Sequence, residues 1–189
     1  MISGCTKLSL ATTLPKRRSS RMMIPKTMLE ADYVLNLAKM KTCAHTTVTL
    51  GIKNLYGCIQ EAKKSRLHKR LDAVLPYLAK TIKTDMTIID GLTCMEGNGP
   101  VVGNPRKMGV IAAGSDIVAV DSFCCRLMGF NPMEIGHISN SASLGMGQIS
   151  DYEVVGDPWE SFVCRFERPY SIKATIKSLG AVRDIYLKR

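Results

Sequence analysis

The stretch MTIIDGLTCMEGNGPVVGNPRKMGVIAAGSDIVAVDSFCCRLM, residues 86–128, contains most of the signals that define the fold class. Its apolar runs at residues 86–91 and 108–114 have the length and composition of buried strands. The residues between these runs, CMEGNGPVVGNP, predict a glycine- and proline-rich loop. A helical pattern that runs to Met128 follows, with Ser115 or Asp116 as its cap and Gly129 as its stop.

The remainder of the chain continues this alternation of strands and helices. An apolar run at residues 32–37 predicts a strand, and apolar spacing predicts a helix over residues 47–57. Residues 66–82 carry an apolar stripe opposite lysine and arginine and predict a second helix. Residues 151–157 predict a further strand. This order predicts an α/β fold with a mostly parallel sheet and flanking helices.

The length of 189 residues favours one domain. We expect an irregular N-terminal segment over residues 1–23 and a single α/β domain over residues 24–189. No stretch approaches the roughly 18 apolar residues of a membrane span, and the N-terminus lacks the apolar core of a secretory signal. These features predict a cytoplasmic protein without a membrane partner.

The seven cysteines are odd in number and irregular in spacing, and no Cys-x-x-Cys pair occurs. This pattern favours reduced thiols and offers no motif for an iron–sulfur cluster or a zinc ribbon. The cofactor is therefore unknown. Cys43, His45 and His137 could ligate a metal together with Cys58 or Cys124, but their spacing gives no support, and we predict no metal site. The pair Cys124-Cys125 fits packing in a helical core.

The net charge of +10 is spread unevenly along the chain. Residues 1–85 carry 16 Lys+Arg and 5 Asp+Glu, a balance of +11, whereas residues 86–189 carry 10 and 11, a balance of −1. Such a basic half attracts anions or an acidic partner. No aromatic residues lie between the basic ones, so a solvated surface is favoured over nucleic-acid binding.

Polar side chains follow the first predicted strand, and in parallel sheets functional groups gather at such strand ends. Several lysines near one strand end can hold a phosphate or a carboxylate, although they can also merely solvate a loop. The candidate anion-binding side chains here are Lys39, Lys41, His45, Lys53 and Asn54.

The second predicted strand exit carries Glu96 ahead of two glycines, Gly97 and Gly99, which allow the backbone to approach a ligand closely. Glu96 could be a general base, a metal ligand or the partner of a lysine. Asp121 lies one turn inside a helix among apolar neighbours, so it needs a buried partner. A lysine is the simplest choice, in either a structural or a catalytic ion pair.

Several long segments resemble the domain-of-unknown-function 362 family. They are EADYVLNLAKMKTCAHTTVTLGIKNLYG, SRLHKRL, TIIDGLTCMEGNGPVVGNP and MGVIAAGSDIVAVDSFCCRLMGFNP, within about residues 24–156. Two positions depart from the family pattern, because Ala38 replaces a proline and Cys43 replaces a histidine, with His45 two residues further on. The resemblance implies an incomplete domain that lacks the family's N-terminal part.

The resemblance also implies a site built from the Lys-Lys, Lys-Asn, Glu-Gly and Asp-Asp motifs, without naming its reaction. Some family members carry a fused iron–sulfur module, and this sequence shows no such module. An iron–sulfur partner protein is therefore one implied partner.

Our leading hypothesis is an enzyme that binds a small anionic substrate. Lys41 and Lys53 hold the anion, Asn54 orients it, and Glu96 acts as acid or base. This hypothesis places Lys41 or Lys53 within reach of Glu96 or Asp121. The alternatives are a non-catalytic accessory protein that docks an iron–sulfur or redox partner, and a nucleic-acid binder that uses the basic half.

Overall fold

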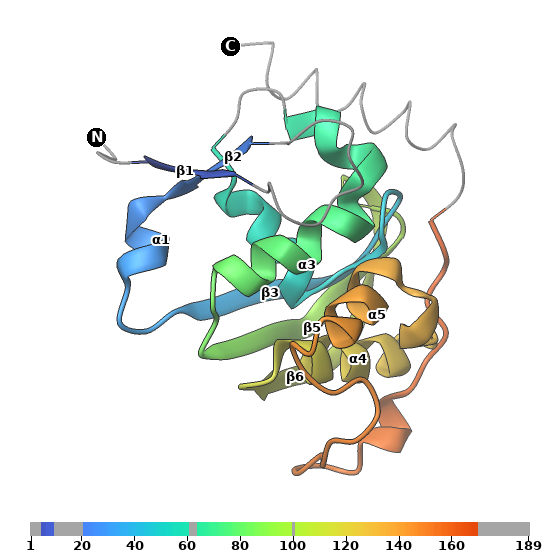
Figure 1. Cartoon of the computed structure of the whole chain (residues 1–189). Coiled ribbons are helices and arrows are strands. Elements are labelled where there is room, and N and C mark those ends of the chain that lie inside the picture. The colour runs from blue at the N-terminus through green and yellow to red at the C-terminus, as the bar shows by residue number, and fades with distance from the viewer. Residues whose placement is uncertain (1–4, 10–20, 61–63, 100, 170–189) are drawn as a thin grey trace.

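The computed structural model describes residues 5–9, 21–60, 64–99 and 101–169 and has an α/β fold (Figure 1). Its centre is a four-stranded sheet in the order β4-β3-β5-β6. The strands are β3 (Leu35–Cys43), β4 (Thr47–Thr49), β5 (Met86–Asn98) and β6 (Val102–Gly114).

The sheet is mixed and mostly antiparallel, so the prediction of a mostly parallel sheet is wrong. Only β3 and β5 pair in parallel within the described part of the chain, whereas β3–β4 and β5–β6 are antiparallel. Most of the residues predicted to form a loop after residue 93 instead belong to β5 and β6. These two strands stay paired as far as Asn98 and Val102. Strands joined by so short a turn can only run antiparallel.

Helices cover one face of this sheet (Figure 1). They are α2 (Gly51–Asn54), α3 (Leu71–Thr81), α4 (Ile117–Leu127) and α5 (Gly136–Ser143). The predicted stripe is buried on α3, although residues 64–70 before it form a 3-10 helix. Along β3, buried and exposed residues alternate, and the opposite face of the sheet exposes Leu35, Leu37 and Ile111.

The two C-terminal helices follow from local signals. The Asp116 carboxylate accepts hydrogen bonds from the N–H groups of Val118 and Ala119 and caps α4 as predicted. Gly129, with φ of +74°, ends the turn that follows this helix. Further 3-10 turns form at Pro132–Glu134 and Trp159–Phe162.

Pro76 lies inside α3 and cannot donate to the carbonyl group four residues before it. That carbonyl belongs to Asp72, and the Asn140 side chain of α5 donates a hydrogen bond to it at 2.9 Å. The neighbouring helix therefore satisfies the acceptor that the proline leaves open.

Three further predictions of secondary structure differ from the structure. The predicted helix at 47–57 divides into β4, α2 and a 3-10 helix at Leu55–Cys58, because its β-branched start pairs with β3. Residues 151–157 form no strand. In the N-terminal segment predicted to be irregular, β1 (Cys5–Ser9) pairs antiparallel with β2 (Arg21–Pro25), and α1 (Lys26–Glu30) follows.

No helix among the described residues is both long enough and apolar enough to cross a membrane.

Candidate functional site

Asp121 lies fully buried on α4 and accepts two backbone hydrogen bonds from α2. Its two carboxylate oxygens bind the N–H groups of Gly51 at 2.7 Å and Ile52 at 2.9 Å. Burial raises the pKa of this carboxyl group to about 7, and the two N–H groups oppose that rise. The sequence predicts a lysine partner, and the structure supplies backbone amides instead.

Two asparagines extend this buried contact to strand β3. The Asn36 side chain donates to the carbonyl oxygen of Gly51 at 3.0 Å. The Asn54 side-chain nitrogen donates to the side chain of Asn36 and to the carbonyl oxygen of Leu37, both at 2.9 Å. The amide nitrogen of Asn54, predicted to orient an anion, therefore ties α2 to β3.

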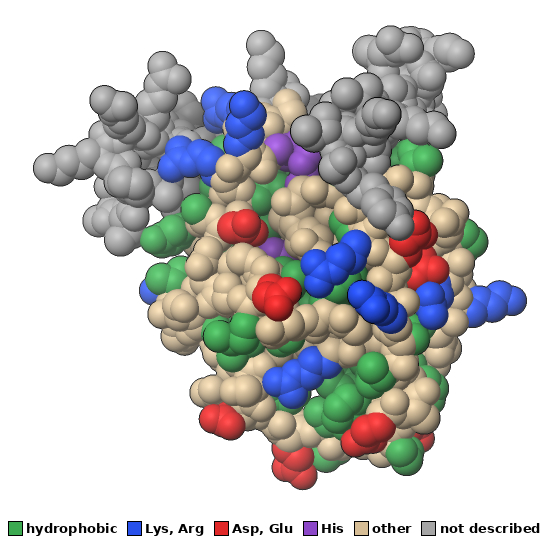
Figure 2. All heavy atoms as spheres, turned by 90° about the vertical axis from the view of Figure 1, so that its right-hand side faces the viewer, with side chains coloured by type: hydrophobic (Ala, Val, Ile, Leu, Met, Phe, Trp, Pro, Cys, Tyr) green, Lys and Arg blue, Asp and Glu red, His purple; other side chains and the backbone are tan. Residues whose placement is uncertain are grey.

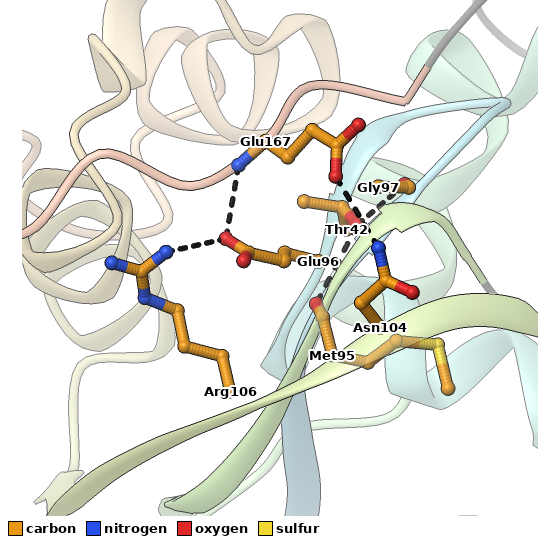
Figure 3. A network of polar contacts seen from close by, with 7 residues as sticks. All are labelled: Thr42, Met95, Glu96, Gly97, Asn104, Arg106 and Glu167. Atoms are coloured by element: carbon orange, nitrogen blue, oxygen red, sulfur yellow. Dashed lines mark hydrogen bonds and ion pairs between the residues drawn. The ribbon is translucent and has the colours of Figure 1, made fainter.

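Glu96 holds the chain segment that contains Glu167 against the β5–β6 hairpin (Figure 3). One Glu96 carboxylate oxygen binds the Arg106 guanidinium at 2.7 Å and accepts from the Glu167 N–H at 3.0 Å. In return, the Gly97 N–H donates to the Glu167 carbonyl oxygen at 3.0 Å. The sequence pointed to a lysine as partner and missed Arg106, which becomes a diagonal neighbour only once the hairpin forms.

The two glycines of this hairpin allow it to pack closely on the end of β3. Gly97 has φ of +75°, and the Thr42 hydroxyl donates to its carbonyl oxygen at 2.8 Å. A Cβ on Gly99 would collide with the backbone carbonyl of Thr42. The close approach that these glycines permit is therefore made by the chain itself, and their predicted contact with a ligand stays a prediction.

Lys39 lies on the exposed face of the sheet. It faces Asp90 in the β3–β5 register, and the two side chains form an ion pair of 2.7 Å. The hydrogen bond from Lys39 lowers the pKa of Asp90. Lys41 is half-buried two residues further along the same strand, opposite Met95.

A cluster of basic and aromatic rings forms where β3 turns into β4. The imidazole rings of His45 and His68 lie 4.3 Å apart, and the Tyr56 ring lies 6.0 Å from that of His68. The Lys53 ammonium lies 4.4 Å from the centre of the Tyr56 ring. The structure thus brings two predicted residues, His45 and Lys53, together with two that were not predicted.

Burial lowers the pKa of both histidines. The charge of Lys53 lowers the pKa of His45 further, and the charges of His45 and then Lys53 do so for His68. These shifts favour the neutral imidazole, which offers one N–H donor and one acceptor nitrogen. Histidine side chains lie beside lysine and arginine side chains in the upper part of the surface shown in Figure 2. His68 was missed because its run, KKSRLHKR, has the composition of a solvated helix face.

The cysteines offer no alternative centre in the part of the chain that the structure describes. Cys124 and Cys125 are fully buried, as predicted, and burial raises the pKa of each thiol well above its ordinary value. Among the described residues, no group of three His, Cys, Asp or Glu side chains could hold a metal ion.

No solved structure matches the chain significantly. The thylakoid-associated protein sll1697 of Synechocystis sp. is 34% identical over 134 residues, which cover 67% of this chain and 42% of that protein. The chain therefore spans less than half the length of this relative. The model of the family described as "Domain of unknown function (DUF362)" matches residues 6–126, which include the polar network, the hairpin and the ring cluster. The chain belongs to the DUF362 family.

Proposed function

We propose that this chain binds a small anion, a phosphate ester or a carboxylate, at the cluster of His45, Lys53 and His68, and that it does so as part of an enzyme. One observation carries the proposal. The ring centres of His45 and His68 lie 4.3 Å apart, and burial together with the charge of Lys53 lowers the pKa of both. Lysine and imidazole N–H groups are donors suited to phosphate and carboxylate oxygens.

The chemistry of such a site would be acid–base catalysis by histidine. A neutral imidazole with a lowered pKa can accept a proton from a bound substrate. A bound anion would offset the field of Lys53 and favour the imidazolium form, which can return the proton. Anion binding should therefore be accompanied by proton uptake, and affinity should rise as the pH falls towards the pKa of the histidines.

The proposal assigns proton transfer to the histidines because Glu96 and Asp121 already accept hydrogen bonds that hold the fold. Glu96 binds Arg106 and a backbone N–H, and Asp121 binds two backbone N–H groups. A catalytic role for either carboxylate stays a prediction. The two alternative functions have less support. Docking of an iron–sulfur partner rests on the family resemblance and the basic half, and nucleic-acid binding rests on the basic half alone.

A titration with inorganic phosphate tests the proposal. NMR signals of the imidazole ring protons of His45 and His68 should shift saturably, and the pKa of each should rise in the presence of phosphate. Phosphate should also raise the melting temperature. Lys53→Met should weaken both effects. Lys39→Met is the matched control, because Lys39 is paired with Asp90 on the exposed sheet face.

If the Lys53 and Lys39 variants respond equally to phosphate, the proposal is contradicted. Phosphate would then act by general screening of the basic half and not by binding at the ring cluster. A shift of the His137 signal without shifts of the His45 and His68 signals would likewise place the anion elsewhere.

A further inference from the structure

A second feature, separate from the ring cluster, is a cavity of about 450 Å³ beside the last strand of the sheet. One wall is the stretch of β6 from Gly109 to Gly114, continued by the start of α4. The other wall is the segment of residues 152–162. The cavity therefore runs along a strand rather than across the sheet.

In the described part of the chain, no strand pairs with the outer edge of β6. β6 is the last strand in the sheet order, with β5 on its inner side and no strand on its outer side among the described residues. Such an edge presents backbone N–H and C=O groups that can accept one more strand. Ile111, on this stretch of β6, is 63% exposed.

Apolar and aromatic side chains form part of the cavity lining, beside polar ones. Phe123 of α4 and Trp159 lie edge to face with their ring centres 5.6 Å apart, and Val120 and Phe162 line the cavity beside them. A surface of this kind accepts apolar side chains, and aromatic residues commonly anchor binding interfaces.

The far wall is anchored to α4 at its beginning. The Ile149 carbonyl oxygen accepts hydrogen bonds from Ser122 at 2.6 Å and from Arg126 at 3.2 Å. The Arg126 guanidinium lies over the Tyr152 ring at 5.4 Å. The cavity is therefore formed before any ligand arrives, which limits the ordering cost of binding.

The charge of the cavity opposes that of the chain. Its charged lining residues are all acidic, namely Asp116, Glu153 and Asp157, although the whole chain carries +10. The Asp116 carboxylate is occupied by the N–H groups that it caps and by that of Gln148. Glu153 and Asp157 are exposed at the rim and can meet a cation. At the lower end of the face in Figure 2, acidic side chains lie around hydrophobic ones.

We propose that this groove binds an extended polypeptide segment in which apolar residues alternate with lysine or arginine. The segment adds to the outer edge of β6 as a further strand. Its apolar side chains enter the cavity against Phe123 and Trp159, and its cations face Glu153 and Asp157. The alternation follows from strand geometry, since successive side chains point to opposite faces.

The chain contains its own reporter, because Trp159 is its only tryptophan and lines the groove. The probe is the synthetic peptide Lys-Val-Thr-Val-Lys-Val-Thr-Val-Lys, added to the full chain at low salt while tryptophan fluorescence is recorded. One comparison peptide carries glutamate in place of each lysine. A second carries proline in place of one threonine and one valine, so that either edge of the peptide lacks an N–H, which keeps the charge but disrupts strand pairing.

We expect a saturable change with the basic peptide, and much weaker binding of both comparison peptides. The double variant Glu153→Gln, Asp157→Asn should weaken binding roughly fivefold, because it removes two exposed charge pairs. The matched control is Asp151→Asn, Glu160→Gln, which removes two exposed acids in or directly before the same segment that do not line the cavity, and it should change affinity less than about twofold.

Absence of a saturable change would overturn the proposal. Equal binding of the proline peptide would exclude strand addition, and equal binding of the acidic peptide would exclude the role of the rim carboxylates. Sedimentation of the chain alone provides a further check. If the chain forms a dimer that buries Trp159, and the rim variant weakens that dimer, then the groove binds a second copy of the chain. This result would also overturn the peptide proposal.

Discussion

The substitution Gly51→Ala tests whether the buried polar network holds the fold. Gly51 begins α2 directly under the Asp121 carboxylate. A Cβ added there would lie 2.7 Å from a methyl carbon of Thr87, 2.9 Å from an Asp121 oxygen and 3.2 Å from the Asn36 side-chain nitrogen. All three neighbours are buried, so none can move into solvent.

The magnitude follows from two contributions. Forcing a methyl group into a filled core costs about 1–3 kcal/mol. Displacing the Asp121 carboxylate from its backbone donors leaves a buried N–H without a partner, which costs about 1–3 kcal/mol more. We therefore expect Gly51→Ala to lower the free energy of unfolding by about 2–6 kcal/mol, a large part of the total for a domain of this size.

Urea unfolding followed by circular dichroism measures this change. Gly57→Ala is the matched control in the next turn of the same segment, because a Cβ there meets nothing within 4 Å. It should change the free energy of unfolding by less than about 0.5 kcal/mol. A Gly51→Ala protein as stable as the Gly57→Ala protein would refute the reasoning and show that the network yields at little cost.

Three further predictions concern other contacts. Because burial raises the pKa of Asp121 from 3.8 to about 7, the folded state keeps a proton that the unfolded state releases. Urea unfolding should therefore show that the stability of wild type relative to Asp121→Asn falls as the pH rises from about 4 to about 7. Asn140→Ala should cost about 1 kcal/mol in thermal unfolding, because the Asp72 carbonyl loses its donor. Glu96→Gln should speed hydrogen exchange of the Glu167 amide more than that of other amides, because it weakens the carboxylate acceptor.

The helix that begins after Asp116 shows what local sequence can determine. Its cap and the glycine that ends the following turn act within a few residues, so their chemistry is readable without knowledge of the fold. The opposite case is the segment at residues 47–57. Its apolar spacing predicts one helix, but pairing of its β-branched start with β3 outweighs that preference.

The candidate site shows the same division. The motif residues are visible in the sequence, and the structure shows that Asn54 and Asp121 fasten segments to one another. Sequence reasoning found His45 and Lys53 but missed His68, which lies 4.3 Å from His45 only after two separate segments have packed together. Sequence reasoning also missed Arg106. It predicted a loop around Glu96, and a loop has no strand register from which the neighbour of Glu96 could be inferred.

Local patterns and residue identities predicted the α/β class, the family and the α4 helix with its stop. These features depend on local dihedral preferences, on periodicity or on residue identity. Packing alone established that the sheet is mostly antiparallel, that Asp121 binds backbone amides and that a cavity forms between β6, α4 and residues 152–162. Strand pairing and burial join residues far apart in the chain, and their energies depend on neighbours that no local pattern specifies.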